Sequence, residues 1–480
     1  MDLSELRKKH TYFVYESYQW EKKGGNLVIG FQFLLEPDIR LNPSIIIPLP
    51  KDSIDTKSLE NFIFHLGLVE AISYWKAACP KEFYIKAGNL THEQTDFWHD
   101  LFINGLGEFF YKNNIDFTQK DFLKISSNQD KKPLSIFSVQ DSSGDLVLTS
   151  GGKDSAVVLE VVKKLNRRLG VLMLNPTKAA LDVTKASEIN KQIIVYRTID
   201  PRLLALNKQG YLNGHTPFSA YLAFLGVFVG ALHSFENVIV GNERSSEEGN
   251  VFFRGKEINH QYSKTYKFEK LFRDYSSKYL TNNVNYFSLL RPLYDLAVSK
   301  IFAHFSKYHK VFRSCNRGKD WCGNCPKCAF VYLSLFSFLS YKKMIEVFGS
   351  DYLQKKSLDG TFKTLLGTSG HKPFECVGTI KESKLAMALA KKIPQKNTEF
   401  LKSFSSSHFI PSAFEEILKL MISDSVLILG YGREGKSAHR FLLDNFPFIK
   451  IAIADRERDG KDYLLHVKEH ATIIRSPGIS

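Results

Sequence analysis

A short polar loop at residues 150–155 carries the clearest chemical signal in the chain. It reads Ser-Gly-Gly-Lys-Asp-Ser and lies between an apolar run, 145–149, and a helical pattern, 155–165. Two glycines between a strand and a helix let the backbone turn tightly with its N–H groups pointing inward, and the helix N-terminus adds positive partial charge. Such a loop suits an anion, and the alternative is a plain glycine turn before a capped helix. The expected phosphate-binding residues are Ser150, Gly151, Gly152, Lys153, Asp154 and Ser155.

The side chains of this loop have the types that phosphate binding uses. Ser150 and Ser155 can donate their hydroxyl hydrogens to phosphate oxygens, and Lys153 can supply positive charge. Asp154 can help to hold a magnesium ion or can cap the helix. The spacing differs from that of the common ATPase loop, which has four residues between its first glycine and Gly-Lys-Ser/Thr.

A cluster of cysteines at residues 315–328 is the second chemical signal. Closely spaced thiolates are the ligands of a closed tetrahedral zinc site, and Arg313, Arg317 and Lys327 would partly offset their charge. An iron–sulfur cluster could use the same ligands, but no redox partner motif is visible, so structural zinc is favoured. Reduced core cysteines are the third interpretation, which the spacing disfavours. The expected metal ligands are Cys315, Cys322, Cys325 and Cys328.

Three polar blocks, 206–217, 241–250 and 258–264, form a third group of candidates. The second block directly follows an apolar run, 237–240, that reads as a strand. Because the carboxyl ends of parallel strands gather at one edge of a sheet, this block should lie at the same edge as the phosphate loop. A solvated loop side chain is the equal alternative for any single residue. The side chains in these blocks that can act as acid, base or charge clamp are His215, His260, Glu243 and Lys264.

Alternating strands and helices must position these residues. From residue 145 onwards, apolar runs that read as strands alternate with helical patterns, which predicts an α/β fold with a parallel sheet covered on both faces. Before residue 140 the two patterns are mixed, which predicts an α+β domain. The expected strands are 26–34, 44–47, 145–149, 170–174, 192–196 and 237–240, and the expected helices are 59–78, 92–110 and 155–165.

Changes in pattern divide the chain into four segments. We expect an N-terminal α+β domain at 1–140, a catalytic domain at 141–400 that includes the cysteine cluster, a linker at 401–424 and a C-terminal unit at 425–480. The linker is indicated by a looser pattern around three consecutive serines, 405–407.

The composition is that of a globular protein with excess positive charge. The chain has 480 residues, 44% of them hydrophobic, and a net charge of +15 with a pI near 9.2. This surplus indicates a polyanionic partner, and a lysine-rich solvated surface is an equal alternative. The N-terminus has no apolar signal core, and the longest apolar stretch, 221–232, is too short to span a bilayer. We therefore expect a cytoplasmic protein without a membrane partner, and six cysteines do not make a secreted disulfide framework.

Several motifs resemble those of known families. The phosphate loop resembles the pyrophosphate loop of N-type ATP pyrophosphatases, the PP-loop enzymes. Similar cysteine clusters follow that loop in the enzymes that make the deazaguanine precursor of modified tRNA bases. A longer series of motifs, which occurs in order, resembles another family: "GLGEFFYKN" (105–113), "LNGHTPFSA" (212–220), "GNERSSEEGN" (241–250), "INHQYSKTYKFE" (258–269), "FSLLRPL" (287–293), "WCGNCPKCAFV" (321–331) and "KPFECVGT" (372–379).

On these motifs, about residues 1–400 are identified as a member of the UDP-N-acetyl-α-D-muramoyl-L-alanyl-L-glutamate epimerase (MurL) family. Ser150 is one departure, because a third glycine is expected there; the serine restores the general pyrophosphatase pattern. The resemblance implies a PP-loop domain of the adenine-nucleotide alpha hydrolase-like type, and it implies ATP and magnesium as cofactors.

The reaction that the resemblance implies takes place at the terminal L-glutamate of UDP-MurNAc-L-Ala-L-Glu. ATP would convert its carboxylate into an acyl-adenylate with release of pyrophosphate, Cα would be epimerised, and hydrolysis would free the D-glutamyl product and AMP. Proton transfer or substrate clamping is expected, unranked, from His260, Lys264, Tyr262, His215 and Glu243. Substrate contacts are expected from Asn213, Asn242, Arg244, Asn259, Gln261 and Arg291.

The last segment carries a separate motif. Residues 425–442 read strand, Gly-x-Gly-x-x-Gly loop, helix, and Asp455 ends the next expected strand, 450–454. Alone, this pattern predicts Rossmann-like dinucleotide binding. Together with the ending Ser-Pro-Gly-Ile-Ser, it resembles the N-terminal domain of UDP-N-acetylmuramoyl-L-alanine–D-glutamate ligase, which holds the UDP of that ligase's substrate. We expect a partial domain without ligase activity and a functional link to that ligase; NAD binding is the alternative.

Two other functions compete with the epimerase hypothesis. A tRNA-modifying enzyme of the 7-cyano-7-deazaguanine synthase type would share the loop and the cysteines and would use the positive charge on RNA. The polar blocks match the epimerase pattern instead, and no added RNA-binding module is visible, so a nucleic acid is not the expected partner. A non-catalytic nucleotide-binding protein is the second competitor, but it predicts a degraded phosphate loop, whereas this loop is intact.

Overall fold

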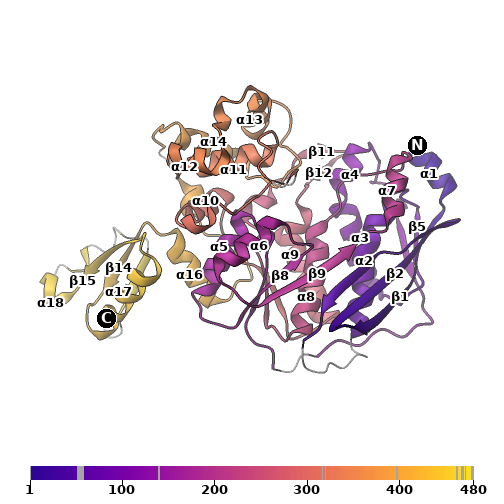
Figure 1. Cartoon of the computed structure of the whole chain (residues 1–480), viewed down its shortest axis with the longest axis horizontal. Helices are drawn as coiled ribbons and strands as arrows, with labels where there is room; N and C mark the ends of the chain where they lie inside the picture. Colours follow the sequence, from indigo (N-terminus) through magenta and orange to yellow (C-terminus); the bar gives the residue numbers. More distant parts are fainter. Residues whose placement is uncertain are drawn as a thin grey trace.

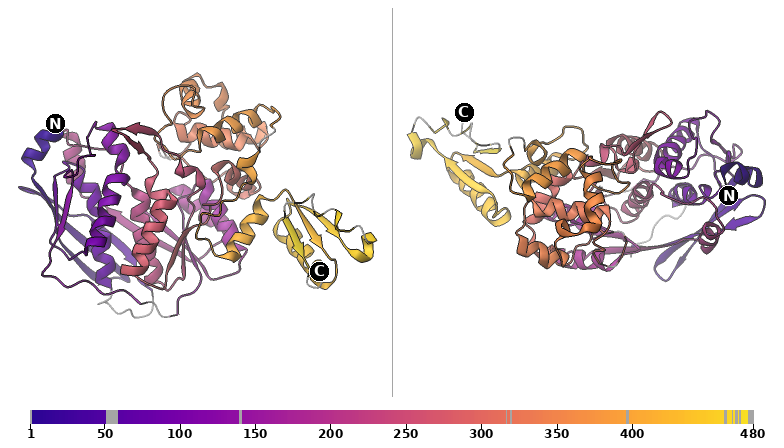
Figure 2. Two further views of the ribbon diagram at one scale, coloured as in Figure 1. Left: turned by 180° about the vertical axis from the view of Figure 1, so that it is seen from behind. Right: turned by 90° about the horizontal axis from the view of Figure 1, so that it is seen from above.

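A large sheet with helices packed against it forms most of the molecule (Figure 1). The helices at residues 326–390 gather beside one end of this sheet, and a small unit at the C-terminus projects from the main body, which it contacts through Phe446 and Phe448 (Figures 1 and 2). The computed structural model describes residues 2–50, 59–138, 141–315, 317–318, 320–395, 398–460, 463–465, 467, 470 and 472–476.

Eleven strands of the described residues form the large sheet, in the order β13-β10-β7-β8-β9-β4-β2-β1-β5-β6, with β3 paired to β2. The strands from β13 to β9 are parallel, those from β9 to β1 pair antiparallel, and β1, β5 and β6 are again parallel. The bounds are β1 (Tyr12–Lys23), β2 (Asn26–Leu35), β3 (Ile39–Leu41), β4 (Ser44–Pro48), β5 (Glu82–Ile85), β6 (Lys124–Ser127), β7 (Asp145–Leu148), β8 (Leu169–Leu174), β9 (Gln192–Thr198), β10 (Asn237–Val240) and β13 (Asn285–Ser288).

The parallel half of this sheet is formed by short apolar strands. Every residue of β10 is buried, as expected for a strand that is covered on both faces. Its first residue, Asn237, lies opposite Asp145 of β7 and donates a hydrogen bond to that carboxylate at 2.8 Å. On the other side, Ile46 of β4 pairs with Tyr196 of β9. Strands from before and after residue 140 thus share one sheet, and the expected domain boundary there stays a prediction.

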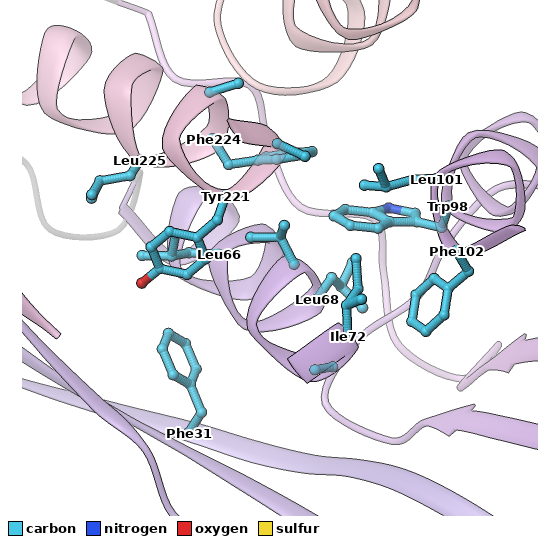
Figure 3. Packing of buried hydrophobic residues seen from close by; sticks show 14 of the residues in the cluster. Phe31, Leu66, Leu68, Ile72, Trp98, Leu101, Phe102, Tyr221, Phe224 and Leu225 are labelled. Atoms are coloured by element: carbon cyan, nitrogen blue, oxygen red, sulfur yellow. The ribbon is translucent and has the colours of Figure 1, made fainter. Parts of the chain in front are cut away.

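Two apolar helices, α2 (Leu59–Trp75) and α8 (Phe218–Leu232), pack together against the sheet. Nearly every residue of α2 is buried, which is typical of a helix that is apolar all round. Trp98 stacks on Phe224 of α8 with ring centroids 5.0 Å apart, and Figure 3 shows this pair beside the leucines of α2. This packing holds residues 59–98 against residues 218–232.

The helix that follows the phosphate loop, α5 (Lys153–Lys163), packs against α6, α10 and α16. The valines and the leucine of α5 are buried, and their packing fixes the position of the helix in the protein. The other α-helices before the C-terminal unit are α1 (Leu3–Lys9), α3 (His92–Gly105), α4 (Gly107–Lys112), α6 (Lys178–Ser187), α7 (Pro201–Lys208), α9 (Tyr266–Tyr279), α10 (Asp295–Ala303), α11 (Pro326–Phe336), α12 (Tyr341–Phe348), α13 (Asp359–Leu365), α14 (Ile380–Ala390), α15 (Glu399–Lys402) and α16 (Ser412–Ile422).

The polar blocks fold into short elements. A two-stranded hairpin, β11 (Val251–Phe253) and β12 (Lys256–Ile258), separates two 3₁₀ turns, η1 (Arg244–Glu247) and η2 (Tyr262–Lys264). Three further 3₁₀ turns are η3 (Ser306–Tyr308), η4 (Tyr352–Gln354) and η5 (Lys356–Leu358).

The C-terminal unit has its own parallel sheet of three strands among the described residues, in the order β15-β14-β16. The expected linker 401–424 contains α16, whose apolar face packs against α5 and α10. The last four residues, 477–480, lie outside the described residues, so the end of the expected Ser-Pro-Gly-Ile-Ser motif does too. The elements of the unit are β14 (Ser425–Leu429), α17 (Arg433–Asn445), β15 (Lys450–Ala454), α18 (Arg456–Asp459) and β16 (Thr472–Arg475).

The expected α/β class is confirmed; each strand expected before residue 400 corresponds to a strand of the large sheet, and the strand expected at 450–454 is β15 of the C-terminal unit. The sheet is mixed rather than wholly parallel, because β4, β2 and β1 join it antiparallel. The expected helix 92–110 is two helices, α3 and α4, that meet at Leu106. Within the described residues, helices fall short of the length and hydropathy that crossing a membrane requires.

Candidate active site

The phosphate loop turns sharply between β7 and α5. Gly151 has a φ of +87°, and a Cβ there would lie 2.4 Å from the backbone nitrogen of Ala180, so this position requires glycine. Gly152 is the N-cap of α5, and no side chain caps the helix. The Ser155 hydroxyl accepts a hydrogen bond from the Ser150 N–H at 3.1 Å and closes the turn. The first turn of α5 is therefore left without a side-chain cap, as in anion-binding helix N-termini.

Lys153 points into the protein rather than into solvent. Its ammonium contacts the Asp154 carboxylate and lies 2.9 Å from Asp295 Oδ1, with no exposed side-chain surface. Burial lowers the pKa of Lys153, but the charges of the two carboxylates outweigh burial and raise this pKa above its usual value. The expected contact between Lys153 and a phosphate stays a prediction, and Asp295 is a partner that the sequence did not indicate.

Asp154 is the acidic group of the loop that remains partly accessible, with 26% of its side chain exposed. Burial raises its pKa, but the ammonium groups of Lys153, Lys327 and Lys264 outweigh burial and lower it below the usual value. Asp154 is therefore an ionised carboxylate at neutral pH, held in place by Lys153. A carboxylate of this kind is suited to a magnesium ion bound to phosphates.

Glu243 follows β10 at the sheet edge that carries the phosphate loop, as the sequence predicts. Its carboxyl group is buried. Burial raises the pKa of Glu243, the charges of Asp154 and Asp295 raise it further, and Lys264 and Lys327 oppose this, so that the pKa is about 7. Glu243 can therefore both hold and release a proton near neutral pH.

Lys264 lies between Glu243 and a cysteine from a distant part of the chain. Its Nζ lies 3.2 Å from the Sγ atom of Cys376. Burial lowers the pKa of Lys264, but the charges of Cys376 and Glu243 outweigh burial and raise it. Lys264 is consequently a charged ammonium group that interacts with two acidic neighbours, Glu243 and Cys376.

Cys376 is a functional candidate that the sequence predictions missed. In addition to the contact with Lys264, His260 Nε2 lies 4.0 Å from the Sγ atom of Cys376. Burial raises the pKa of the Cys376 thiol, but Lys264, His260 and Lys327 outweigh burial and hold this pKa at about 5. Cys376 is therefore a thiolate at neutral pH. The motif at 372–379 contains it, but no spacing in the sequence links it to residues 260–264.

Glu108 of α4 holds the other side of His260. The imidazole Nδ1 of His260 donates to Glu108 Oε2, and Lys112 of the same helix contacts the second carboxylate oxygen. Burial lowers the pKa of His260, but the hydrogen bonds to Cys376 and Glu108 outweigh burial and raise it to about 9. His260 is therefore an imidazolium that links a carboxylate to a thiolate.

His215 lies against this pair. Its ring centroid is 4.4 Å from that of His260, and its Nδ1 lies 3.5 Å from Glu108 Oε2. Burial and the charge of His260 lower the pKa of His215 to about 3, so it is a neutral imidazole. The ligand atoms of Glu108, His215 and His260 lie within 4.8 Å of one another, and the hydrogen bond between His260 and Glu108 accounts for this closeness without an ion.

Two candidates have contacts that favour a structural role. Arg291 is buried: its guanidinium donates to the Glu269 carboxylate at 3.2 Å, to the Glu243 carbonyl at 3.1 Å and to the carbonyl of Lys264. It thereby ties the second polar block to the third, with few donors left for a substrate. The Tyr262 hydroxyl contacts Asp100 of α3, away from Lys264 and His260.

The remaining substrate candidates lie at various depths. Asn242 donates to the Ser288 hydroxyl at 3.1 Å, and Asn259 donates to the Ser246 carbonyl at 2.8 Å, so both side chains have partners within the protein. Gln261 is buried, and its Oε1 has no hydrogen-bond partner in the described part of the chain. Asn213 is exposed, and Arg244, which stacks on Tyr294, is partly exposed. Their predicted contacts with a substrate stay predictions.

The four clustered cysteines are brought together. Their Sγ atoms all lie within 4.8 Å of one another, and Cys322 Sγ lies 3.7 Å from Cys328 Sγ. Four sulfurs bound tetrahedrally to one zinc ion at about 2.3 Å would lie about 3.8 Å apart, so the residues fit such an ion. Backbone N–H groups also point at the sulfurs, with Cys328 N 3.4 Å from Cys325 Sγ. All six cysteines lie in the described part of the chain, and none forms a disulfide.

The cysteine cluster is attached to the active site at two points. Before it, the N–H of Arg313 donates to the Gly151 carbonyl at 2.9 Å, and Ser314 lies against Gly152. After it, Lys327 at the start of α11 donates to the carbonyl of Cys376. An ion in this cluster would therefore fix both the phosphate loop and Lys327.

The glycine loop of the C-terminal unit is closed by its own side chains. A Cβ at Gly435 would lie 2.0 Å from the Gly430 carbonyl oxygen, so α17 packs tightly on the loop. The Asp455 carboxylate accepts hydrogen bonds from the N–H groups of Tyr431, at 2.5 Å, and of Glu457, at 2.9 Å. Asp455 therefore already has backbone partners, which weakens the NAD alternative, in which an acidic residue here binds a ribose.

Comparisons with known proteins agree along most of the chain. The model of the MurL N-terminal domain matches residues 4–289, and that of the MurL C-terminal domain matches residues 305–410. Three relatives carry the name UDP-N-acetyl-alpha-D-muramoyl-L-alanyl-L-glutamate epimerase. The protein from a Micromonospora species is 31% identical, with 81% of this chain and 88% of the relative covered. The protein from Xanthomonas oryzae pv. oryzae is 33% identical (71% and 76%), and that from Salinispora tropica is 32% identical (81% and 86%).

Proposed function

Because the chain belongs to the UDP-N-acetyl-α-D-muramoyl-L-alanyl-L-glutamate epimerase family, we propose that it inverts the terminal L-glutamate of UDP-MurNAc-L-Ala-L-Glu to D-glutamate in peptidoglycan precursor synthesis. In this proposal ATP first transfers AMP to the α-carboxylate of that residue and releases pyrophosphate. Hydrolysis after inversion releases AMP and the D-glutamyl product.

The chemistry of the substrate explains why activation is needed. The Cα–H of a terminal glutamate lies next to an anionic carboxylate, which resists further negative charge, so its proton is hard to remove. A neutral acyl-adenylate removes that charge and makes the Cα–H far more acidic. An enzyme of this kind must therefore hold the phosphates of ATP and the proton-transfer groups in one site.

The phosphate loop is the part of the site that suits the pyrophosphate of ATP. The uncapped N-terminus of α5 and the hydroxyls of Ser150 and Ser155 can hold phosphate oxygens. Asp154 would hold magnesium, which neutralises phosphate charge when bound. Lys153 keeps Asp154 in place through the contact described above.

One observation supports the proposal more than any other. Groups that can bind phosphate and groups that can move protons form a continuous set at one edge of the sheet. From Asp154 the set passes through Glu243 and Lys264 to Cys376 and His260, and each group is charged or titratable near neutral pH. Cys376 comes from the C-terminal family domain and the others from the N-terminal one.

For the cysteine cluster we propose a structural zinc ion. The donor set is four sulfurs, and its geometry fits tetrahedral coordination. Bound zinc would hold the segment between Arg313 and Lys327, and hence both the phosphate loop and the position of Lys327. The role proposed for the ion is positioning, with the chemistry done elsewhere.

The experiment that tests the function follows three products at once. Purified protein is incubated with UDP-MurNAc-L-Ala-L-Glu, ATP and magnesium in D₂O, and AMP, glutamate chirality after acid hydrolysis and deuterium at Cα are measured. D-glutamate that carries deuterium, formed together with AMP, is the expected result. Absence of AMP and of exchange with this substrate would contradict the proposal.

A tRNA-modifying PP-loop enzyme is the second candidate function, because it would share the loop and the four-sulfur site. The same assay separates the two when a nucleobase carboxylate or tRNA replaces the dipeptide. AMP formation that depends on those substrates, and not on the dipeptide, would favour the second candidate. For the C-terminal unit, we propose a link to the D-glutamate-adding ligase, whose UDP-holding domain it resembles.

A further inference from the structure

Cys376 is placed where three chain segments meet. Lys264 of η2 and His260 after β12 approach its sulfur at 3.2 and 4.0 Å, and Lys327 of α11 contacts its carbonyl oxygen. Cys376 as a residue is partly exposed, and so is the side chain of His260. A buried structural cysteine has a different environment: Cys79 is fully buried, and burial raises its pKa.

The groups around the sulfur favour its ionised form. Two cations, Lys264 and His260, face it directly, and the charge of Lys327 adds to theirs, while the preceding residue, Glu375, is an acidic neighbour. Behind His260, the Glu108 carboxylate holds the imidazole ring in orientation and keeps it protonated. The order Cys376, His260, Glu108 is that of a nucleophile or base, its partner and an orienting carboxylate.

We propose that the Cys376 thiolate is the catalytic base that takes the Cα proton from the adenylated L-glutamyl residue. This inference rests on the proposed function. In the step, the Cα–H bond breaks, its electron pair passes into the acyl-adenylate as an enolate, and the proton forms an S–H bond. The proton returned to the opposite face comes from another acid, and Glu243 and Lys264 carry suitable protons.

A resting thiolate fits the role of base better than that of nucleophile. The adenylate already activates the carboxyl group, so a thioester of Cys376 would add no further activation. The reaction still needs a proton acceptor, and the other groups near the sulfur, Lys264 and His260, are already protonated. Lys264, 3.2 Å from the sulfur, is also placed to stabilise the negative charge of the enolate.

The test compares Cys376→Ser and Cys376→Ala with wild-type protein and with Cys79→Ala, a cysteine variant outside the site. All four are incubated with UDP-MurNAc-L-Ala-L-Glu, ATP and magnesium in D₂O. We expect both Cys376 variants to lose roughly 10²-fold or more in D-glutamate formation and Cα deuteration, since a serine hydroxyl is not ionised at pH 7. Pyrophosphate release in the first turnover, which precedes proton removal, should stay within about threefold of wild type, because the phosphate loop is unchanged.

The outcomes separate the two proposals. No AMP from wild-type protein overturns the proposed function itself. AMP from wild-type protein together with near-normal epimerisation by Cys376→Ser overturns the role of Cys376 and leaves the function standing. A dipeptidyl adduct on Cys376 in acid-quenched wild-type protein would overturn the role of base in favour of a nucleophile.

A reversible thiol block keeps the test valid if the variants fail to fold. Methyl methanethiosulfonate is applied to wild-type protein at pH 6, where an ionised thiol reacts faster than ordinary ones. Methylthiolation of Cys376, located by peptide mass, should abolish Cα deuteration, and dithiothreitol should restore it. Full epimerisation by protein blocked at Cys376 would overturn the proposal.

Discussion

Glu108→Gln is the substitution that separates the charge of Glu108 from its shape. In the wild-type protein the pKa of His260 is about 9, against 6.5 for a free histidine, and the hydrogen bonds to Cys376 and to Glu108 together cause this rise against the effect of burial. A glutamine can still accept a hydrogen bond from Nδ1 but carries no charge. The hydrogen bond to Cys376 remains in the variant, and loss of the Glu108 charge lowers the pKa of His260 below its wild-type value.

The imidazolium is present below its pKa and is lost as the pH rises through it, so activity that needs it falls earlier in the variant. Above the lowered pKa of the variant, the protonated fraction of His260, and with it the rate, falls by up to roughly tenfold per pH unit until the wild-type pKa is reached. Near pH 6, where His260 is protonated in both proteins, the difference in rate disappears.

The assay is kcat/KM for D-glutamate formation between pH 6 and 10. Glu93→Gln is the matched control, because Glu93 is an exposed residue of α3 whose ion pair with Lys278 lies outside the site. A variant with an unchanged upper limb, or with an equal loss of rate at every pH, would refute the reasoning. The first result would show that Glu108 does not set the charge of His260, and the second would indicate a purely structural role.

Three further predictions concern other parts of the molecule. Asp154→Asn should lower AMP and pyrophosphate formation at least roughly 100-fold, while Cys376 still reacts rapidly with methyl methanethiosulfonate; AMP formation within threefold of wild type would contradict the role of the loop. Purified protein should contain one zinc ion per chain by elemental analysis. Cys322→Ser should lose the zinc and should melt at a lower temperature than wild type. A wild-type protein that melts at the same temperature with and without the metal would exclude a structural ion. Arg291→Met should cost about 3–5 kcal/mol in the free energy of unfolding in urea, because the Glu269 carboxylate stays buried without its partner; a loss under 1 kcal/mol would contradict the structural role of Arg291.

The parts of the site that could be predicted from the sequence are those whose residues are close together in it. The phosphate loop carries its glycines, hydroxyls and acid within six positions, and the four cysteines lie within residues 315–328. Glu243 could be placed because it directly follows a strand, and the carboxyl ends of parallel strands share an edge. In each case local spacing alone defines which side chains meet.

The proton-transfer groups could not be assembled in this way. Glu108, His260 and Cys376 are separated by more than a hundred residues each, and they meet only because α4, the η2 region and the segment before α14 pack together. Residue type alone also cannot show whether a polar group is already satisfied. Arg291 was expected to bind a substrate, but its donors are mostly used within the protein, which only the fold determines.

The order and pairing of the strands in the sheet also could not be predicted from the sequence pattern. The strands themselves were readable as apolar runs, but the pairing of β4 with β9 joins segments about 150 residues apart. Nothing in either strand specifies this partner, because an exposed edge of a parallel sheet accepts either orientation of strand. The expected separation of residues 1–140 followed from a change in pattern, which does not report on pairing.

The arrangement of acidic and basic side chains along the site explains why the site is formed by residues of both family domains. Passing from Lys153 through Asp154, Glu243 and Lys264 to Cys376, each acidic group faces a cation, so a set of buried charges is held without an unpaired member. Lys264 belongs to both halves of this set, because it faces Glu243 on the phosphate side and Cys376 on the proton-transfer side. In the proposed reaction, an acyl-adenylate would form at the first half and be deprotonated at the second. Since such an adenylate is readily hydrolysed, a site that activates and deprotonates it in one place wastes less ATP than two separate sites would.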